Sequence, residues 1–196
     1  MDDQPHTQVN RFELQLDDSG SYDFVIDGVR LRGQIYGPDD ANGADVTLLN
    51  VQHALTWSEE QTRQLLGELP GALIPDRVWL YFCSACGDED CGGSSVAIDF
   101  HADCVVWHDF AHDLGPEWGR IQGWTLAPDD IIEGLGPYRF DRNEYTTAFR
   151  ELLKQLQDEH RAEQTRLARL AEDLGNRAGP WAKWRGRRGR HRAIDE

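Results

Sequence analysis

Three segments with strong β-strand character lie close together in the middle of the sequence. They are residues 77–83 (RVWLYFC), 94–100 (SSVAIDF) and 104–110 (CVVWHDF). β-branched and aromatic residues dominate these segments, as is typical of strands. A tight His-Ala-Asp turn joins the second segment to the third. We therefore predict three antiparallel strands that form the centre of a sheet.

The first third of the sequence predicts further strands, arranged as a meander of hairpins. Phe12, Leu14 and Leu16 alternate with polar residues, which is the period of a strand. Turn signals separate this segment from three more predicted strands, residues 22–26, 29–36 and 46–51. Ser58 and Gln61 have the spacing of a capping box, which predicts that a short helix begins there and continues through Leu66.

A long helix is predicted near the C-terminus. Asp141 and Glu144 form a second capping signature, and the helical pattern continues to Gly175, a predicted glycine cap. In its first half, apolar residues recur at helical spacing and should pack on the sheet: Tyr145, Phe149, Leu152, Leu153 and Leu156. The predicted fold class is α+β, an antiparallel sheet (hairpin meander) packed against one or two helices, with a long C-terminal helix. Gly and Pro punctuate residues 113–137, which we expect to form loops.

The second half of the long helix has a different character. Residues 157–166 (QDEHRAEQTR) are polar on nearly all sides, and Leu167, Leu170 and Leu174 then form a short apolar seam. An exposed apolar seam needs a cover, because a helix is stabilised in proteins mainly by packing of its apolar face. We therefore expect the seam to engage a protein partner or a second copy of the chain.

Charge is distributed unevenly along the chain. Residues 1–176 carry 13 basic and 33 acidic side chains, so 13 − 33 gives −20, whereas the last 20 residues are rich in arginine. The basic and aromatic residues expected to contact a partner are Trp181, Trp184, Arg185, Arg187, Arg188 and Arg190. Such a tail can bind an acidic protein surface or the phosphates and bases of a nucleic acid, and both remain open. We expect a core domain (1–156), a helix extension (157–176) and a flexible basic tail (177–196).

The composition and the N-terminal residues limit the class of protein. Apolar residues make up 39% of the chain, which is enough for a core and atypical of disordered proteins. No apolar run approaches the roughly 20 residues that span a bilayer, and the acidic start MDDQPHTQVN is unlike a secretory signal. We therefore expect a cytoplasmic protein that does not bind membranes. The sequence also lacks the GxxxxGK[ST], GxGxxG, HExxH and GxSxG patterns of common catalytic sites.

A cluster of cysteines lies between the first two central strands. Cys83 ends the first strand, and Cys86 and Cys91 lie in the ten-residue loop that follows it (SACGDEDCGG). Two residues between thiolates allow both sulfur atoms to reach one tetrahedral zinc ion at about 2.3 Å. Glycine follows each loop cysteine and permits the tight backbone of a zinc knuckle. Zinc is therefore the one cofactor that the sequence indicates.

A fourth zinc ligand is needed, and the sequence offers several. His108 is our candidate, because the predicted strand register puts it near Val96; His112, Asp88 and Asp90 are alternatives. His108 also shares the strand alternation of Val106 and Phe110, and a histidine on an apolar face is often a hydrogen-bonded core residue. Cys104 is excluded, since the register puts it roughly 20 Å away at the other end of the sheet.

Two readings without zinc also explain the cysteine cluster. The thiols can be free, or two of them can form a redox-active pair. The redox reading is weakened by residues 88–90 (Asp-Glu-Asp), because neighbouring carboxylates raise the pKa of a thiol and lower its reactivity.

Residues 77–153 contain three motifs that together resemble a family. The stretches LYFCSACGDEDCGG, VVWHDF and GPYRFDRNEYTTAF are similar to an uncharacterised family of small actinobacterial proteins, in which a strand ends in Cys-x-x-Cys-Gly-Asp-x-x-Cys-Gly. The resemblance implies a shared fold and a family role for the three-cysteine loop, with Cys104 outside the pattern. It implies no established activity.

We predict a non-enzymatic binding or regulatory protein. In this hypothesis the cysteine loop holds structural zinc, while the C-terminal helix and the arginine-rich tail engage a protein partner. The alternatives are a thiol-based oxidoreductase and a protein that binds nucleic acid through the Arg/Trp tail.

Overall fold

The computed structural model describes residues 8–37, 45–50, 55–71, 77–83, 92–113 and 130–177. The chain divides into two compact units, residues 1–157 and residues 158–196. The first unit contains the strands and the short helices, and the second contains the C-terminal part of the long helix. The fold is α+β, as predicted from the sequence.

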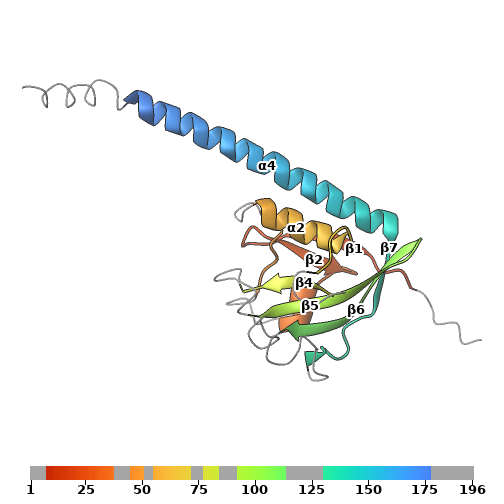
Figure 1. The fold of residues 1–196 in the computed structure, drawn as a ribbon. Coiled ribbons are helices and arrows are strands. Elements are labelled where there is room, and N and C mark those ends of the chain that lie inside the picture. Colours follow the sequence, from red (N-terminus) through yellow and green to blue (C-terminus); the bar gives the residue numbers. More distant parts are fainter. Residues whose placement is uncertain are drawn as a thin grey trace, which may run out of the picture. The chain divides into compact units, whose positions relative to one another are not determined.

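A three-stranded antiparallel sheet is formed by β1 (Phe12–Leu16), β2 (Tyr22–Ile26) and β3 (Val29–Arg30) (Figure 1). The first two strands and the turns between the three were predicted correctly. The predicted strand 29–36 was wrong beyond Arg30, because the chain forms helix α1 (Leu31–Tyr36) there. Val29, Leu31 and Ile35 fit a strand period, but Leu31 and Ile35 also lie one helical turn apart, so the apolar pattern was ambiguous.

The central strands form a four-stranded antiparallel sheet in the order β4 (Arg77–Phe82), β5 (Gly93–Phe100), β6 (Cys104–Asp113) and β7 (Tyr138–Asp141). The first three of these strands confirm the predicted meander. The short strand β7 was not predicted. In place of a regular strand at 46–51, single bridges join Val46 to Phe82 and Asn50 to Ser21, and Val51 lies outside the described residues.

Helix α2 (Leu55–Leu65) corrects the predicted capping box. Ser58 and Gln61 lie inside this helix and are buried, so they do not cap its start. Ser58 Oγ donates to the carbonyl of Leu48 at 2.6 Å. Gln61 Nε2 donates to the carbonyls of Trp79 (3.0 Å) and Leu80 (3.1 Å), beside the irregularity in the pairing of β4 with β5. These two polar side chains therefore attach α2 to neighbouring backbone, a role that local spacing does not reveal.

Helix α4 (Arg142–Arg177) begins as the sequence predicts. Asp141 Oδ1 accepts hydrogen bonds from the amides of Asn143 (2.9 Å) and Glu144 (3.0 Å), which is N-terminal capping. Gly175 lies inside the helix, so it is not the predicted C-terminal cap.

The first turns of α4 complete the core of the first unit. Tyr145, Phe149 and Leu156 are at most 1% exposed, and Leu152 is 4% exposed. The hydroxyl of Tyr145 donates to the carbonyl of Leu65 at 2.6 Å, so α4 and α2 lie side by side in the first unit (Figure 1). An aromatic cluster fills the space between these helices and the sheets; it comprises Phe12, Phe24, Trp107, Phe140, Tyr145 and Phe149.

Candidate functional site

The cysteine loop begins at the end of β4. Cys83 follows this strand and is half-buried. Phe82 pairs with Gly93, so the predicted hairpin forms, but β4 ends one residue earlier than predicted and the connection begins at Cys83. Cys86 and Cys91 lie outside the described residues. The gathering of the three sulfur atoms therefore stays a prediction.

Polar side chains from two other segments lie at this end of the sheet. The bridge between Val46 and Phe82 puts Asp45 opposite Cys83 in an antiparallel register. The Asp45 carboxylate accepts a hydrogen bond from the hydroxyl of Tyr36 at 2.9 Å. A carboxylate is thus placed beside the first cysteine of the loop.

Tyr36 connects this carboxylate to the sheet. Its hydroxyl also forms a hydrogen bond of 2.6 Å with Ser94 Oγ. A phenol has one proton, so when Tyr36 donates to Asp45 the Ser94 hydroxyl is the donor of the second bond. The exposed His112 pairs with Ser94, and its ring lies 5.8 Å from the ring of Tyr36. Of the two histidines considered as the fourth zinc ligand, His112 is therefore at the cysteine end.

His108 lies farther along the sheet. It pairs with Ala97, next to Val96 as predicted, and Ala97 is four residues from Gly93 on β5. At 3.3 Å per residue, the backbone of Ala97 lies about 13 Å along the strand from that of Gly93. The donor atoms of two ligands of one zinc ion lie within about 5 Å of each other. The register therefore argues against His108 as a ligand of an ion that Cys83 holds.

His108 instead lies between two carboxylates. Its Nδ1 is 2.9 Å from Asp109 Oδ2, and its Nε2 is 3.2 Å from Asp99 Oδ2. Both aspartates are more than 60% exposed. Within the described parts of the chain, no group of three or more His, Cys, Asp or Glu side chains has the arrangement of a metal site.

A bulge in β6 explains why Phe110 does not lie on the face that His108 shares with Val106, although the strand alternation predicts that all three share it. Asp109 has a positive φ of +50°, and the pairing of β5 with β6 shifts at this point. The shift turns Phe110 into the core, where it is 0% exposed, while His108 keeps the outer face that it shares with Val106. Arg77 holds the bulge, because its Nη2 donates to the carbonyl of Asp109 at 2.7 Å.

Cys104 lies at the opposite end of the sheet from Cys83, as predicted. It pairs with Asp141, and its neighbour Val105 pairs with Phe100 at the far end of β5. The Cys104 side chain is buried. Burial raises the pKa of its thiol, and a hydrogen bond with Asp103 raises it further. These properties are those of an unreactive thiol.

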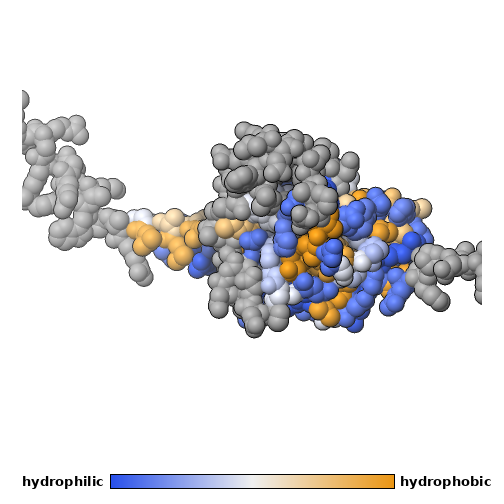
Figure 2. Space-filling view, turned by 90° about the horizontal axis from the view of Figure 1, so that it is seen from below, coloured by the Kyte–Doolittle hydropathy of each residue, from blue (hydrophilic) through white to orange (hydrophobic). Residues whose placement is uncertain are grey.

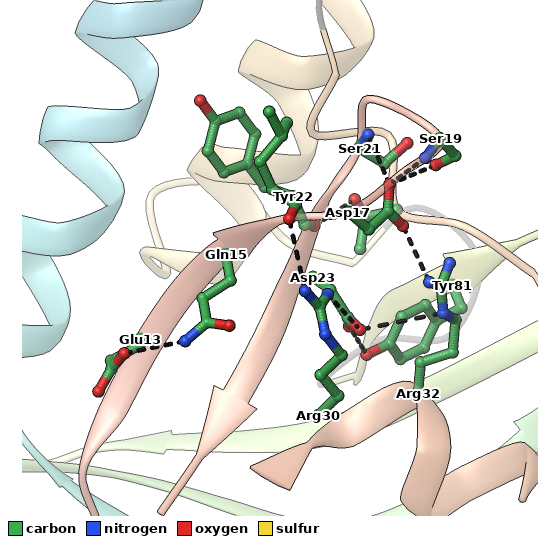
Figure 3. A network of polar contacts seen from close by, with 12 residues as sticks. Glu13, Gln15, Asp17, Ser19, Ser21, Tyr22, Asp23, Arg30, Arg32 and Tyr81 are labelled. Atoms are coloured by element: carbon green, nitrogen blue, oxygen red, sulfur yellow. Dashed lines mark hydrogen bonds and ion pairs between the residues drawn. The ribbon is translucent and has the colours of Figure 1, made fainter. Parts of the chain in front are cut away.

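A partly buried network of charged residues, which sequence reasoning missed, connects β2, α1 and β4 (Figure 3). Asp23 is 2% exposed, and its Oδ1 accepts a hydrogen bond of 2.6 Å from the hydroxyl of Tyr81. Its Oδ2 faces Arg30 Nη1 at 3.6 Å and Arg32 Nε at 3.9 Å. Among the described residues, Asp23 thus has one close hydrogen bond and two longer ionic contacts.

Asp17 adds a second carboxylate to this network. Its Oδ1 accepts hydrogen bonds from the amides of Ser19 (2.8 Å) and Ser21 (3.0 Å) and from the Ser19 hydroxyl. Its Oδ2 lies 2.9 Å from Arg32 Nη2. Burial alone would raise the pKa of Asp17, but the hydrogen bonds from Ser19 and Ser21, with the charge of Arg32, lower it overall.

The network holds α1 against the turn between β1 and β2. Asp17 and Asp23 carry two negative charges, and Arg30 and Arg32 carry two positive charges, so the formal charges cancel. Burial and the adjacent Asp23 raise the pKa of Tyr81 well above its usual value, so its hydroxyl remains a proton donor. One signal in the sequence was available: Asp23 interrupts the apolar strand YDFVI.

The predicted apolar seam lies on the C-terminal part of α4. Leu167, Leu170 and Leu174 are 52%, 45% and 66% exposed. Residues 161–175 are all exposed, and Figure 2 shows hydrophobic surface on this part of the helix. The predicted contact residues of the tail lie outside the described residues; they are Trp181, Trp184, Arg185, Arg187, Arg188 and Arg190.

Comparisons of the chain with protein-family models, with curated proteins and with solved structures found no match. The resemblance to the actinobacterial family with the three-cysteine motif therefore stays a prediction. Among the helices that the structure describes, none combines the length and the apolar character that crossing a membrane requires.

Proposed function

We propose that this chain is a non-enzymatic binding protein that docks a protein partner through the C-terminal part of α4. The exposure of Leu167, Leu170 and Leu174 is the observation that carries this proposal. Burial of leucine side chains lowers the free energy by about 25 cal/mol per Å² of apolar surface removed from water. A partner that covers the three leucines would obtain this stabilisation.

The physics of isolated helices supports an interface here. Residues 158–177 continue α4 for 20 residues. The side chains of residues 161–175 are all exposed. Most of the stability of a helix in a protein comes from packing of its apolar face, and this part of α4 lacks such packing within the described residues. The ion pairs Arg161–Asp158 and Arg166–Glu163 lie on the surface, where salt weakens them. Docking would therefore stabilise the helix that provides the surface.

The arginine-rich tail forms the second part of the proposal. It follows the helix directly and carries seven Lys and Arg with two acidic residues between positions 177 and 196. We propose that it contacts an acidic protein surface, while binding to nucleic acid is the alternative outcome. If the tail binds nucleic acid, the affinity should fall strongly as the salt concentration rises, and binding should be lost when residues 178–196 are removed.

A structural zinc site in the cysteine loop is a second proposal. Cys83, Cys86 and Cys91 would supply three ligands, and the structure favours His112 or Asp45 as the fourth, because both lie at the end of the sheet where the loop begins. Bound zinc would cross-link the loop. The redox alternative requires a reactive thiolate among the same cysteines.

The docking proposal is tested with the full chain and a seam variant. Leu170→Gln combined with Leu174→Gln removes the apolar surface, and Glu172→Gln on the opposite side of the helix is the matched control. Proteins cross-linked to each chain in extract of the source organism are identified, and binding is repeated with purified components. The proposal predicts a partner that binds the wild type and the control but not the seam variant. Equal binding by all three chains refutes it.

A further inference from the structure

We propose that the partner at the seam is a second copy of this chain, bound antiparallel along α4. The inference rests on the proposed docking function and adds the identity and direction of the partner. It is carried by the spacing of the exposed leucines, the charges beside them, and the distribution of charge between the two ends of the chain.

The leucines have the spacing of a coiled-coil seam. Leu167, Leu170 and Leu174 are separated by three and then four residues, so they occupy successive a, d and a positions of a heptad. In an antiparallel pair, a positions of one helix pack against d positions of the other. Leu167 of each copy then packs against Leu170 of the other, and these four leucines form the centre of the interface.

The residues beside the seam distinguish the two possible directions. Arg166 and Asp173 both occupy g positions, one heptad apart on the same edge of the seam. In the antiparallel pair with Leu167 opposite Leu170, Arg166 of each copy faces Asp173 of the other, so two opposite-charge contacts form. In a parallel pair Arg166 would face Ala171, and this contact would be lost.

The carboxylate of Glu163 also lies on the seam. Arg166 forms two hydrogen bonds with Glu163, at 2.6 and 2.7 Å, and Glu163 is the next d position before Leu167. In the antiparallel register Leu174 of the second copy lies opposite Glu163. The ion pair with Arg166 neutralises this carboxylate. A parallel pair would instead place the two copies of Glu163 opposite each other. Repulsion between the two carboxylates disfavours this arrangement.

The net charges of the two ends of the chain favour the same direction. Residues 1–157 carry 10 basic and 28 acidic side chains (10 − 28 = −18), and residues 177–196 carry 7 basic and 2 acidic (7 − 2 = +5). In the antiparallel register each helix ends level with His160 of the other copy, close in sequence to its acidic unit. A parallel pair would bring two basic tails together.

Sedimentation velocity of the full chain, from about 1 to 200 µM, tests this inference, because the short seam predicts a weak dimer. We expect a dimer that weakens about tenfold in Arg166→Asp and in Asp173→Arg, since each replacement puts like charges in contact. The double variant, which exchanges the two charges, should bind more tightly than either single variant but less tightly than the wild type, because Glu163 no longer has Arg166 beside it. Glu172→Gln, which lies away from the seam, should have no effect.

Three results would overturn the inference. A chain that remains monomeric at every concentration excludes a second copy as partner, while the docking proposal then depends on seam-dependent binding of a different protein. A dimer that Leu170→Gln abolishes, but in which the double charge exchange restores nothing, contradicts the antiparallel register. A dimer that tolerates both Leu170→Gln and Leu174→Gln contradicts the docking proposal as well.

Discussion

Removal of the Tyr81 hydroxyl should destabilise the chain far more than a single oxygen atom suggests. Tyr81 is fully buried and donates to Asp23 Oδ1 at 2.6 Å. In Tyr81→Phe the packing is kept, but Asp23 loses its one close hydrogen-bond donor, and its Oδ2 has no hydrogen-bond donor within the described residues. The remaining contacts, to Arg30 and Arg32, are 3.6 and 3.9 Å long.

The expected cost follows from these contacts. A hydrogen bond to a charged group contributes about 1.5–3 kcal/mol, and a buried acceptor left without a donor adds to the loss. Full loss of the partners of a buried charge costs about 3–5 kcal/mol, but the two arginines remain and limit the effect. We therefore predict that Tyr81→Phe lowers the free energy of unfolding by about 2–3 kcal/mol.

Urea denaturation followed by tryptophan fluorescence measures this change. Tyr138→Phe is the matched control, because its hydroxyl donates to Gln34 at an exposed position, at 2.9 Å; its cost should stay below about 1 kcal/mol. A double-mutant cycle with Asp23→Asn should give a coupling of about 1 kcal/mol or more. Equal small costs for Tyr81→Phe and Tyr138→Phe, with no coupling to Asp23, would refute the role of the network.

Three further predictions follow from individual residues. The pKa of Asp17 is lower in the folded chain than the usual 3.8, so its carboxylate stabilises the fold above that pH and the contribution is lost as pH falls through the folded pKa; Asp17→Asn should therefore lower the free energy of unfolding at pH 6, and this cost should shrink as the pH is lowered below 3.8, as urea titrations over this pH range can show. Asp141→Ala should cost about 1 kcal/mol by the same assay, because two amides at the start of α4 lose their acceptor; an unchanged unfolding midpoint would contradict the capping role. Metal analysis of protein purified without chelator should find one equivalent of zinc in the wild type and in Cys104→Ser, and none in Cys83→Ser; a metal-free wild type with one fast-reacting thiol would favour the redox alternative.

The parts of the fold that the sequence predicted are those specified by neighbouring residues. The strands at 77–82, 93–100 and 104–113 carry their own apolar and aromatic residues, and a three-residue turn joins the second to the third. The start of α4 depends on Asp141 and the two amides that follow within three residues. Local pattern was sufficient in these cases because the interacting groups are close in the chain.

The parts that the sequence did not predict depend on distant residues. Gln61 has the spacing of a capping residue, yet its amide binds carbonyls 18 and 19 residues away. The hydrogen bond between Tyr81 and Asp23 joins residues that are 58 positions apart. The bulge at Asp109 depends on Arg77 from another strand, and it changed the face on which Phe110 lies. No periodicity within a single segment reports such contacts.

The candidate site also has features that local sequence predicts and features that depend on distant residues. The positions of Cys83 and Cys104 at opposite ends of the sheet followed from hairpin geometry alone. Strand alternation alone does not distinguish His108 from His112 as a ligand, because one bulge changes the register of every later residue in the strand. The exposed leucines of α4 were visible in the sequence because helical spacing is a local property.

Hydrogen–deuterium exchange of residues 158–177, measured over a series of protein concentrations, tests the docking role of α4 most directly. A helix end without buried apolar contacts opens locally and exchanges rapidly, whereas a helix packed against a second copy is protected. We predict that the protection of these amides rises with concentration in the wild type and in Glu172→Gln, and stays low in the chain with both Leu170→Gln and Leu174→Gln. Protection that is independent of concentration and unchanged by these substitutions would contradict self-association through the seam.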